Sequence, residues 1–312
     1  MLTPTLTPYF AVQNYLAMEN KKALIFGASG QDGYYLSLLL SKNGITVINI
    51  SRNGSGLKGD AGDHDFVEDV IKDKRPDYIF HLAANSTTKH TALYENQHVV
   101  VNGALHILES ARSFCPAARI FIAGSALQFR NEGKPINEKT PFEASSAYAL
   151  ARIQSTYAAR YFRDTFGMKV FVGYFFNHDS SLRTENHVNQ KIVMAAKRFS
   201  LGEKGKLRIG DIHVQKEFNF AGDMTEAAWK LVSQDKIAEA VLGCGRAYTI
   251  KEWLTCCFEG LGLNWQDFVE QDNQYKREYD VLVSDPRLLF EMGWAPAVNF
   301  YQLADMMLKG GK

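Results

Sequence analysis

Three glycines in one short segment have the spacing that a dinucleotide-binding loop needs. Residues 27–33 read Gly-Ala-Ser-Gly-Gln-Asp-Gly, between a short apolar run (22–26) and a stretch with helical apolar spacing (31–42). Glycine leaves room for a tight turn and for a pyrophosphate close to the backbone. The helix amino terminus behind it offers unpaired N–H groups and the positive end of its dipole. In this context the glycines predict a dinucleotide site.

The end of the second apolar run indicates which dinucleotide. Residues 50–53 read Ile-Ser-Arg-Asn, with no acidic residue to accept the ribose hydroxyls of NAD. Arg52 can pair with a ribose phosphate and Ser51 can donate to it, although a solvated surface arginine is the alternative. We therefore expect NADP(H) rather than NAD(H). The other residues expected around the cofactor are Gly27, Ser29, Gly30, Gln31, Asp32, Gly33, Asp60, Ala61, Leu82, Ala83 and Ala84.

Strand-length apolar runs alternate with helical stretches over the first 176 residues. In helix 31–42 we expect Tyr35, Leu38 and Leu39 to form the apolar face. Alternation of this kind implies right-handed crossovers and a parallel sheet covered on both faces. The predicted strands are 22–26, 46–50, 77–83, 119–123 and 169–176, and the helical stretches are 31–42, 64–72, 91–114 and 145–166. The fold class predicted is α/β, a Rossmann-type doubly wound parallel sheet with a smaller C-terminal substrate-binding lobe.

The alternation breaks after residue 176. Residues 218–220, 225–232 and 240–242 are expected to form one more unit that returns to the sheet. The predicted dinucleotide-binding domain is therefore 21–176 plus a return segment at about 214–245, and the substrate-binding lobe is 177–213 with 246–312. Residues 1–20 have no basic region and no cleavage pattern, so we expect an N-terminal extension rather than a signal peptide.

Composition excludes several classes of function. The chain has 35 Lys+Arg against 34 Asp+Glu, so no broad basic face is expected for nucleic acid. No apolar run approaches the roughly 20 residues that a membrane span needs. The four cysteines form no Cys-x-x-Cys pair and are expected to be thiols in a reducing compartment, without a metal site. We expect a cytoplasmic protein that binds small molecules, not nucleic acid or membrane.

The sequence resembles the extended short-chain dehydrogenase/reductase superfamily, which contains the NAD-dependent epimerases and dehydratases, and in particular the group of GDP-mannose 4,6-dehydratase. The resemblance covers about residues 21–308. It rests on the glycine loop, on His-Leu-Ala-Ala-Asn-Ser at 81–86, on Asn102, on the helix of Tyr148 and on Phe-Asn-His-Asp-Ser at 176–180.

The resemblance implies a catalytic trio of Ser/Thr, Tyr and Lys, which matches Ser125, Tyr148 and the position of Arg152. The tyrosine of the family exchanges a proton with a sugar hydroxyl or ketone, while the nicotinamide exchanges hydride. A free tyrosine titrates near pH 10, so a nearby cation must favour its ionised form. Arginine at i+4 supplies a charge but cannot relay protons. Tyr148 and Arg152 are also expected at the cofactor, and a packed helix aromatic is the alternative for Tyr148.

A second departure concerns the reaction. The dehydratases carry an acidic residue two positions after the hydroxyl residue, where this chain has Leu127 followed by Gln128. A leucine performs no acid–base chemistry, so 4,6-dehydration is disfavoured, whereas hydride transfer at C4 of a sugar needs no such carboxylate.

The resemblance also implies a nucleoside-diphosphate sugar, with a GDP-sugar favoured. Leu182 replaces one of two expected arginines, Lys216 stands where the family prefers arginine, and Tyr275 occupies the arginine position of an Arg-x-x-Glu-Val segment. Each basic residue alone could be a solvated surface charge. The expected substrate contacts are Ser86, Ser125, Asn177, Arg183, Val188, Lys191, Arg208, Lys216 and Arg277.

Two long helices, 91–114 and 145–166, would lie side by side, and the resemblance implies a homodimer through them. Their exposed stripe would hold Leu105, Leu108, Tyr157, Ala158 and Tyr161. Packing of these residues against the sheet is the alternative.

Three functions stay open at this point. The first is an NADPH-dependent enzyme that transfers hydride to C4 of a nucleotide-linked 4-keto sugar. The second is a divergent GDP-mannose 4,6-dehydratase, a lyase, in which another group replaces the missing carboxylate. The third is a catalytically degenerate cofactor-binding protein, because both Leu127 and Arg152 depart from the family's pattern.

Overall fold

The central sheet is parallel throughout and has seven strands in the order β3-β2-β1-β4-β5-β6-β11. The computed structural model describes residues 20–272, 274 and 277–310. The strands of this sheet are β1 (Lys22–Phe26), β2 (Thr46–Ser51), β3 (Leu57–Lys58), β4 (Tyr78–His81), β5 (Arg119–Ser125), β6 (Lys169–Phe175) and β11 (Glu239–Leu242). The predicted Rossmann-type fold class is confirmed, and β3 is a short edge strand that the sequence pattern did not show.

The strand order reverses at β1, which pairs with β2 on one side and β4 on the other. Ala23 is in register with Val47 of β2 and with Tyr78 of β4. Ligands of open α/β sheets bind beyond the carboxyl ends of the strands at such a reversal. The loops after β1, β4 and β5 are therefore the ones to inspect for a site.

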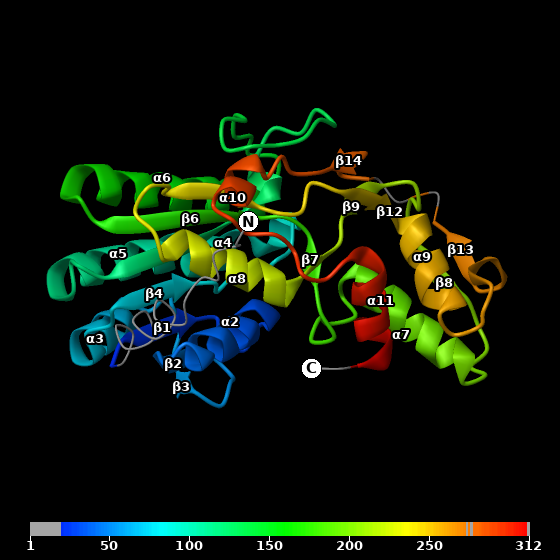
Figure 1. Cartoon of the computed structure of the whole chain (residues 1–312), viewed down its shortest axis with the longest axis horizontal. Coiled ribbons are helices and arrows are strands. Elements are labelled where there is room, and N and C mark those ends of the chain that lie inside the picture. Colours follow the sequence, from blue (N-terminus) through cyan, green and yellow to red (C-terminus); the bar gives the residue numbers. More distant parts are fainter. Residues whose placement is uncertain (1–19, 273, 275–276, 311–312) are drawn as a thin grey trace, which may run out of the picture.

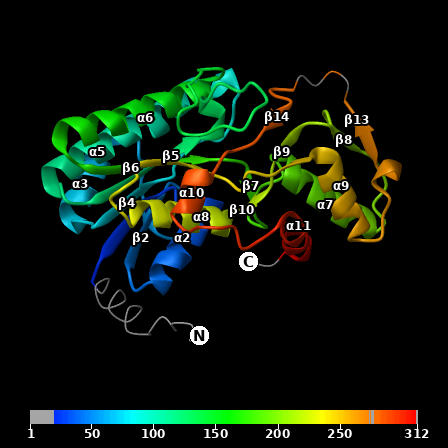
Figure 2. The ribbon, with the colours of Figure 1, turned by 45° about the horizontal axis from the view of Figure 1, so that its top comes forward.

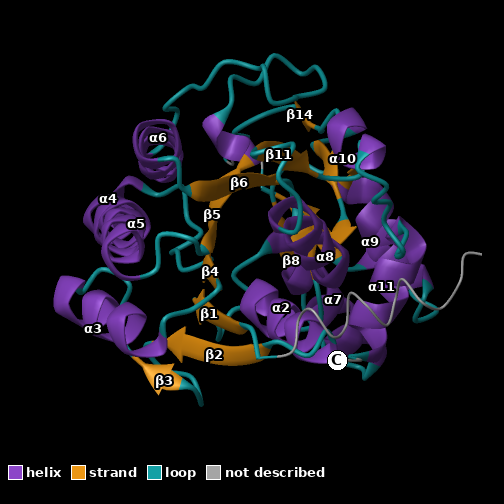
Figure 3. Cartoon of the chain, turned by 60° about the vertical axis from the view of Figure 1, so that its left-hand side comes forward, coloured by secondary structure: helices purple, strands orange, loops and turns teal. Residues whose placement is uncertain are grey.

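Helices cover both faces of this sheet (Figure 3). One face packs against α3, α5 and α6 through an apolar cluster that includes Val67, Ile107 and Phe162, and the other packs against α2, α8 and α10 through Leu36, Met224 and Leu289. The helices are α2 (Gln31–Lys42), α3 (His64–Lys74), α4 (Leu93–Asn96), α5 (Gly103–Phe114), α6 (Ala147–Phe166), α8 (Ala221–Val232) and α10 (Arg287–Glu291).

A second group of elements lies beyond one end of the sheet (Figures 1 and 2). It has its own apolar core, in which Phe218, Trp253 and Phe300 pack together. Its helices are α7 (Val188–Ser200), α9 (Ile250–Glu259) and α11 (Phe300–Lys309). Its short strands, with those that join it to the sheet, are β7 (His178–Asp179), β8 (Leu207–Ile209), β9 (Gln215–Glu217), β10 (Asn219–Phe220), β12 (Ala247–Thr249), β13 (Val269–Gln271) and β14 (Val281–Leu282).

Helix α6, which carries Tyr148 and Arg152, is sharply delimited. The Ser146 side chain accepts a hydrogen bond from the backbone N–H of Ala149, as an N-cap residue does. Gly167 ends the helix with φ 65°, in the left-handed conformation that glycine adopts without strain. The Ser146 cap therefore marks the start of the helix, with Tyr148 and Arg152 in its first two turns, and Gly167 marks its end.

Three local expectations are corrected by the structure. In α2 the buried apolar residues are Leu36 and Leu40, while Leu38 is 53% exposed; the helix has apolar residues on several faces, so spacing alone did not select one. The segment 218–220 does not return to the central sheet, because β10 pairs with β7. The helical stretch 91–114 contains a π-helical turn at Gln97–Asn102.

The stripe predicted on α5 and α6 is exposed only in part. Leu105, Tyr157 and Tyr161 are 41%, 56% and 56% exposed, whereas Leu108 is fully buried in the core against the sheet. Ala158 is partly buried against that same core.

In the described part of the chain, no helix combines the length and apolar character required to cross a bilayer. Residues 1–19, nearly all of the predicted extension, and Tyr275 lie outside the described residues.

Candidate active site

The glycine loop is shaped by contacts of backbone with backbone. Gly27 has φ 91°, and a Cβ added there would lie 2.6 Å from the Ala83 nitrogen. A Cβ on Gly33 would lie 2.5 Å from the Ala28 Cα. Gly30 differs, because the nearest atom to an added Cβ is the Gly27 oxygen at 3.4 Å. Two of the glycines are therefore required by the fold itself, and the third leaves open space in front of the α2 amino terminus.

A cavity of about 360 Å³ lies over this loop. It fits a dinucleotide, since it runs from the glycine turn and the start of α2 to the end of β2. The predicted cofactor residues that line it are Gly27, Ser29, Gly30, Gln31, Asp32, Gly33, Ser51, Arg52, Asp60, Ala61, Leu82, Ala83 and Ala84. Tyr148 and Arg152, also predicted at the cofactor, lie in the neighbouring cavity instead.

The two groups expected at a ribose phosphate have protein partners. An Arg52 Nη2 lies 3.4 Å from Glu95 Oε1, and Ser51 Oγ accepts a hydrogen bond of 2.9 Å from the Gly54 nitrogen. The second Glu95 oxygen accepts from Asn85 Nδ2 at 2.7 Å. Glu95 therefore joins the Arg52 guanidinium to a residue of the adjoining cavity.

The second cavity measures about 1080 Å³ and shares walls with the first at Asp32, Leu82, Ser86, Arg183 and His187. It opens between the carboxyl edge of the central sheet and the second group of elements. Every predicted substrate residue lines it: Ser86, Ser125, Asn177, Arg183, Val188, Lys191, Arg208, Lys216 and Arg277.

Tyr148 and Arg152 meet inside this cavity. Arg152 Nε donates to Tyr148 Oη at 3.1 Å, and Arg152 also donates to the carbonyl oxygen of Ala123 on β5. Tyr148 is 8% and Arg152 4% exposed. Because the guanidinium is held by the strand, it presents a fixed positive charge to the phenol oxygen. Tyr148 is thus a cavity residue rather than a packed helix aromatic.

Ser125 is the last residue of β5 and lines the same cavity. Its Oγ accepts a hydrogen bond of 3.3 Å from the Leu127 nitrogen, and the Leu127 side chain lines the cavity while packing on the core. The position two residues after Ser125, where the resemblance implies an acidic residue, is therefore an apolar part of the wall.

Among the described lining residues, the carboxylates are bonded elsewhere. Asp32 is hydrogen-bonded to His178, and Asp211 accepts a hydrogen bond from Arg277. Glu278 accepts one from Thr88, and Asp272 accepts one from the Gln274 nitrogen. None of these bonds involves Ser125 or Tyr148.

A neutral histidine lies beneath the site. His81 ends β4 and is completely buried, with Nε2 at 3.3 Å from the Val100 carbonyl oxygen. Burial, and then the positive charge of Arg152, lower the pKa of His81 to about 4. The imidazole is therefore uncharged at neutral pH, and Arg152 is the cation next to Tyr148.

A partly buried ion pair joins the two cavities. His178 Nε2 lies 2.9 Å from Asp32 Oδ1, and its Nδ1 lies 2.7 Å from the Phe176 carbonyl oxygen. Burial alone would lower the pKa of His178, but Asp32 outweighs it and the pKa is raised. Burial alone would raise the pKa of Asp32, but His178 outweighs it and the pKa is lowered. Both ring nitrogens face acceptors, as in an imidazolium.

Three arginines of the larger cavity are each paired with a carboxylate. Arg183 pairs with Asp179 at 3.4 Å, Arg208 with Glu270 at 3.6 Å, and Arg277 with both Asp211 and Asp280. The number of basic residues in the sequence is therefore a poor measure of the positive charge that the cavity offers to a ligand.

Lys216 differs from these three arginines. It is 7% exposed, its Nζ lies 5.4 Å from the centre of the Phe218 ring, and its ammonium group makes no ion pair or hydrogen bond with another described residue. Burial, only partly offset by Asp179, lowers the pKa of Lys216 to about 8. An unpaired buried ammonium that lines a cavity suits an anionic ligand.

Several lining residues were not predicted, among them Asn85, Thr88, His178, His187 and Glu278. His178 belongs to the motif at 176–180, so its presence was visible, although its partner Asp32 was not. The others follow strands or face the cavity from loops, where the sequence has no periodic signal.

The comparisons with known proteins point in one direction. Residues 24–307 match the family described as GDP-mannose 4,6 dehydratase. GDP-mannose 4,6 dehydratase 1 of Arabidopsis thaliana is 34% identical, over 92% of this chain and 89% of that protein. GDP-mannose 4,6-dehydratase of Sinorhizobium fredii is 28% identical, over 93% of this chain and 96% of that protein.

Solved structures share the fold. RMD from Pseudomonas aeruginosa, complexed with NADPH, superimposes with a TM-score of 0.82 at 19% identity, over 93% of this chain and 98% of that chain. UDP-glucose 4-epimerase of Thermus thermophilus, complexed with NAD, gives 0.80 at 19% identity over the same shares. At these identities the likeness establishes the arrangement of the chain and nothing finer.

Proposed function

The chain belongs to the GDP-mannose 4,6-dehydratase family, a group of nucleotide-sugar-modifying extended short-chain dehydrogenases/reductases, and from this premise we propose that it reduces a nucleotide-linked 4-keto sugar with NADPH. The observation that carries the proposal is the pairing of Tyr148 with Arg152 in a cavity whose wall is apolar at Leu127. A GDP-sugar is the favoured substrate, because the similar curated proteins are named for GDP-mannose.

NADP(H) would be held by the residues of the smaller cavity. The glycine turn and the α2 amino terminus would take the pyrophosphate, and Arg52 with Ser51 would take the ribose phosphate. When bound, this cofactor supplies the hydride that reduces a ketone.

The chain's own residues supply the proton. Tyr148 donates its phenolic proton to the C4 oxygen as that carbon gains hydride, so the C=O group becomes CH–OH and the tyrosine is left as phenolate. Arg152 stabilises the phenolate through the hydrogen bond to Oη, and solvent returns the proton because a guanidinium gives none up. Ser125 orients the C4 oxygen. The phosphates of the substrate are bound by Lys216, with the other cavity cations further along.

Loss of water between C5 and C6 requires an acid and a base at those carbons. Leu127 provides neither, and the described carboxylates of the cavity are bonded to other groups. The proposal therefore places this chain after a dehydration, on a sugar that already carries the keto group.

The test follows NADPH oxidation with a GDP-4-keto-6-deoxy sugar. Tyr148→Phe removes the proton donor and should lower kcat about 1000-fold, within the range of about 100- to 10,000-fold that a positioned general acid contributes. The matched control is Tyr161→Phe on the same helix, which is 56% exposed and should retain activity. Undiminished turnover in Tyr148→Phe would refute the assigned role.

A divergent 4,6-dehydratase is the second candidate, and membership of the family favours it. It requires GDP-mannose, incubated with NADP⁺, to become a 4-keto-6-deoxy product with no net change in the cofactor. If the chain binds NADPH but turns over neither substrate, it is a cofactor-binding protein without catalysis.

We also propose that the protein is a homodimer through α5 and α6. The exposed Leu105, Tyr157 and Tyr161 form the apolar patch that a second copy would cover. Sedimentation of Tyr157→Glu as a monomer, with the wild type as a dimer, is the expected result.

A further inference from the structure

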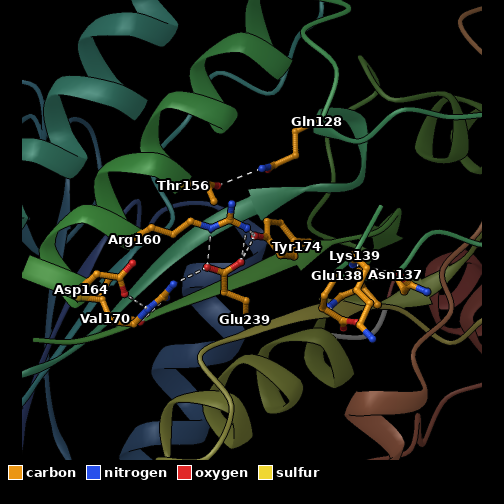
Figure 4. Close-up of polar contacts among 12 residues, drawn as sticks. Gln128, Asn137, Glu138, Lys139, Thr156, Arg160, Asp164, Val170, Tyr174 and Glu239 are labelled. Atoms are coloured by element: carbon orange, nitrogen blue, oxygen red, sulfur yellow. Dashed lines mark hydrogen bonds and ion pairs between the residues drawn. The ribbon is translucent and has the colours of Figure 1, made fainter. Parts of the chain in front are cut away.

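A buried amide lies directly behind Ser125. Gln128 is completely buried, and both ends of its side chain are bonded. Its Oε1 accepts a hydrogen bond of 2.9 Å from the Ser125 nitrogen, and its Nε2 donates to Thr156 Oγ1 at 3.0 Å. The second of these bonds joins the loop after β5 to helix α6 (Figure 4).

The path continues to the catalytic arginine. Thr156 Oγ1 donates to the Arg152 carbonyl oxygen at 2.9 Å. The Arg152 guanidinium in turn bonds Ala123 on β5 and the Tyr148 hydroxyl. A closed circuit of hydrogen bonds thus runs from the backbone of Ser125 through Gln128 and Thr156 to Arg152, and back to β5.

The absence of a side chain at Gly124 leaves space for the Gln128 amide and the Tyr174 ring. A Cβ on Gly124 would lie 3.1 Å from Gln128 Oε1 and 2.5 Å from Cδ1 of Tyr174. The Tyr174 ring is itself fixed, because its hydroxyl donates to Glu239 at 2.6 Å and Glu239 is held by Arg160 (Figure 4). Rotation of the Gln128 side chain would break both of its hydrogen bonds.

Burying an amide costs more desolvation free energy than burying an apolar side chain of similar volume. An apolar side chain of similar volume would satisfy the packing, whereas an amide must bond all its polar atoms to avoid a desolvation cost. We propose that Gln128 is a positioning residue, which sets the place of Ser125 relative to Tyr148 by tying the end of β5 to the turn of α6 that carries Arg152. This inference rests on the proposed function, since it assumes that Ser125 and Tyr148 act on one substrate oxygen.

The physical reason for such a tie is geometric. The Ser125 hydroxyl and the Tyr148 hydroxyl come from different elements, a strand end and a helix, and must meet at one oxygen atom. A displacement of about 1 Å at a reacting centre costs on the order of 100-fold in rate. The two hydrogen bonds that link the Ser125 backbone through Gln128 to the helix keep that error small, and they add nothing to the binding of the rest of the substrate.

The experiment uses two near-isosteric substitutions and two controls. Gln128→Met removes both hydrogen bonds, and Thr156→Val removes the partner of Nε2. Ser155→Ala is the matched control, because Ser155 Oγ donates to the same Arg152 carbonyl at 3.0 Å without touching Gln128. Thr156→Ser keeps the hydroxyl and is the conservative rescue.

With a GDP-4-keto-6-deoxy sugar and NADPH, Gln128→Met should lower kcat about 10-fold or more, while KM for the sugar stays within about twofold. Thr156→Val should lower kcat similarly, and the double variant should be no worse than either single one, because the two residues serve one tie. Ser155→Ala and Thr156→Ser should keep wild-type kcat. Unchanged kcat in Gln128→Met, or an equal loss in Ser155→Ala, would overturn the positioning role.

A second readout does not depend on turnover. Hydrogen exchange of the Ser125 amide, measured by NMR on folded protein, should be faster in Gln128→Met than in the wild type and unchanged in Ser155→Ala. If the wild-type protein does not oxidise NADPH with this sugar, the proposed function is refuted, and the exchange rates alone then test the role of Gln128. Equal exchange rates of the Ser125 amide in Gln128→Met and in the wild type would overturn that role.

Discussion

The glycine loop at 27–33 and the arginines of the larger cavity are constrained by different physical effects. In the loop, Gly27 and Gly33 are held by contacts with backbone atoms that any side chain would violate. In the wall, Arg183, Arg208 and Arg277 could each change partners, and in the structure each is paired with a carboxylate. Steric exclusion therefore determines the residue types in the loop, whereas the charge of the cavity wall depends on which carboxylates pair with its arginines.

Steric requirements of a site are visible in a sequence, whereas the net charge of a site is not. A requirement for glycine follows from steric exclusion over a few residues, so it is visible in the order of the amino acids. The charge that a cavity offers depends on acids brought from other elements, as with Arg277 and Asp211, which are 66 positions apart. The Lys216 ammonium has no ion pair among the described residues, and Asp179 only partly offsets the effect of its burial.

The largest effect should come from the loop. Gly27→Ala puts a Cβ within 2.6 Å of backbone and demands φ 91° of a residue with a side chain, so we expect a loss of on the order of 3 kcal/mol of stability without any cofactor. Gly30→Ala should melt like the wild type but bind NADPH at least about 10-fold more weakly, because its methyl group faces the cofactor. Thermal melting and NADPH titration of both variants check this. Equal melting temperatures for Gly27→Ala and wild type would contradict the steric account.

A smaller effect is expected at Lys216. Its pKa of about 8 means that the ammonium loses its proton, and its charge, as the pH rises through that value. A bond to a charged group contributes about 1.5–3 kcal/mol, so affinity for a nucleoside diphosphate should fall about 10-fold from pH 7 to pH 9. Titration calorimetry with GDP measures this fall. Lys216→Arg should bind equally at both pH values, and a flat profile in the wild type would show that Lys216 does not contact the phosphates.

The smallest effect is expected at Glu95, which partly neutralises Arg52 through an exposed ion pair. Such pairs contribute below about 1 kcal/mol, so Glu95→Gln should improve NADPH affinity about threefold and leave NADH affinity unchanged. Arg52→Gln should weaken NADPH binding and leave NADH binding unchanged. Equal changes for the two cofactors would contradict a ribose-phosphate site at Arg52.

The sequence alone predicted the parallel sheet and the glycine loop. Each predicted site residue lines one of the two adjoining cavities. It was insufficient for links between distant side chains. Asp32 and His178 are 146 positions apart, and the bond from Gln128 to Thr156 requires that a polar amide be buried beside a helix. Local periodicity describes which face of an element is apolar, but not which polar groups from other elements will meet it.

The exposed stripe illustrates the same limit on a smaller scale. Leu105 and Leu108 are both apolar and lie on one helix, yet one is 41% exposed and the other is buried. A three-residue step turns a side chain by most of a full revolution, and the remaining angle decides whether it faces the sheet or solvent.

The central claim is that Tyr148 and Arg152 support reduction at C4 in a cavity that lacks the acid for dehydration. The most direct measurement supplies NADPH deuterated at the transferred position, together with a GDP-4-keto-6-deoxy sugar, and locates the label by NMR. The account predicts one deuterium at C4 of the product for each NADPH oxidised, and no conversion of GDP-mannose in a parallel reaction that contains NADP⁺. Conversion of GDP-mannose to a keto product without NADPH oxidation, or a reduced product with no deuterium at C4, would contradict it.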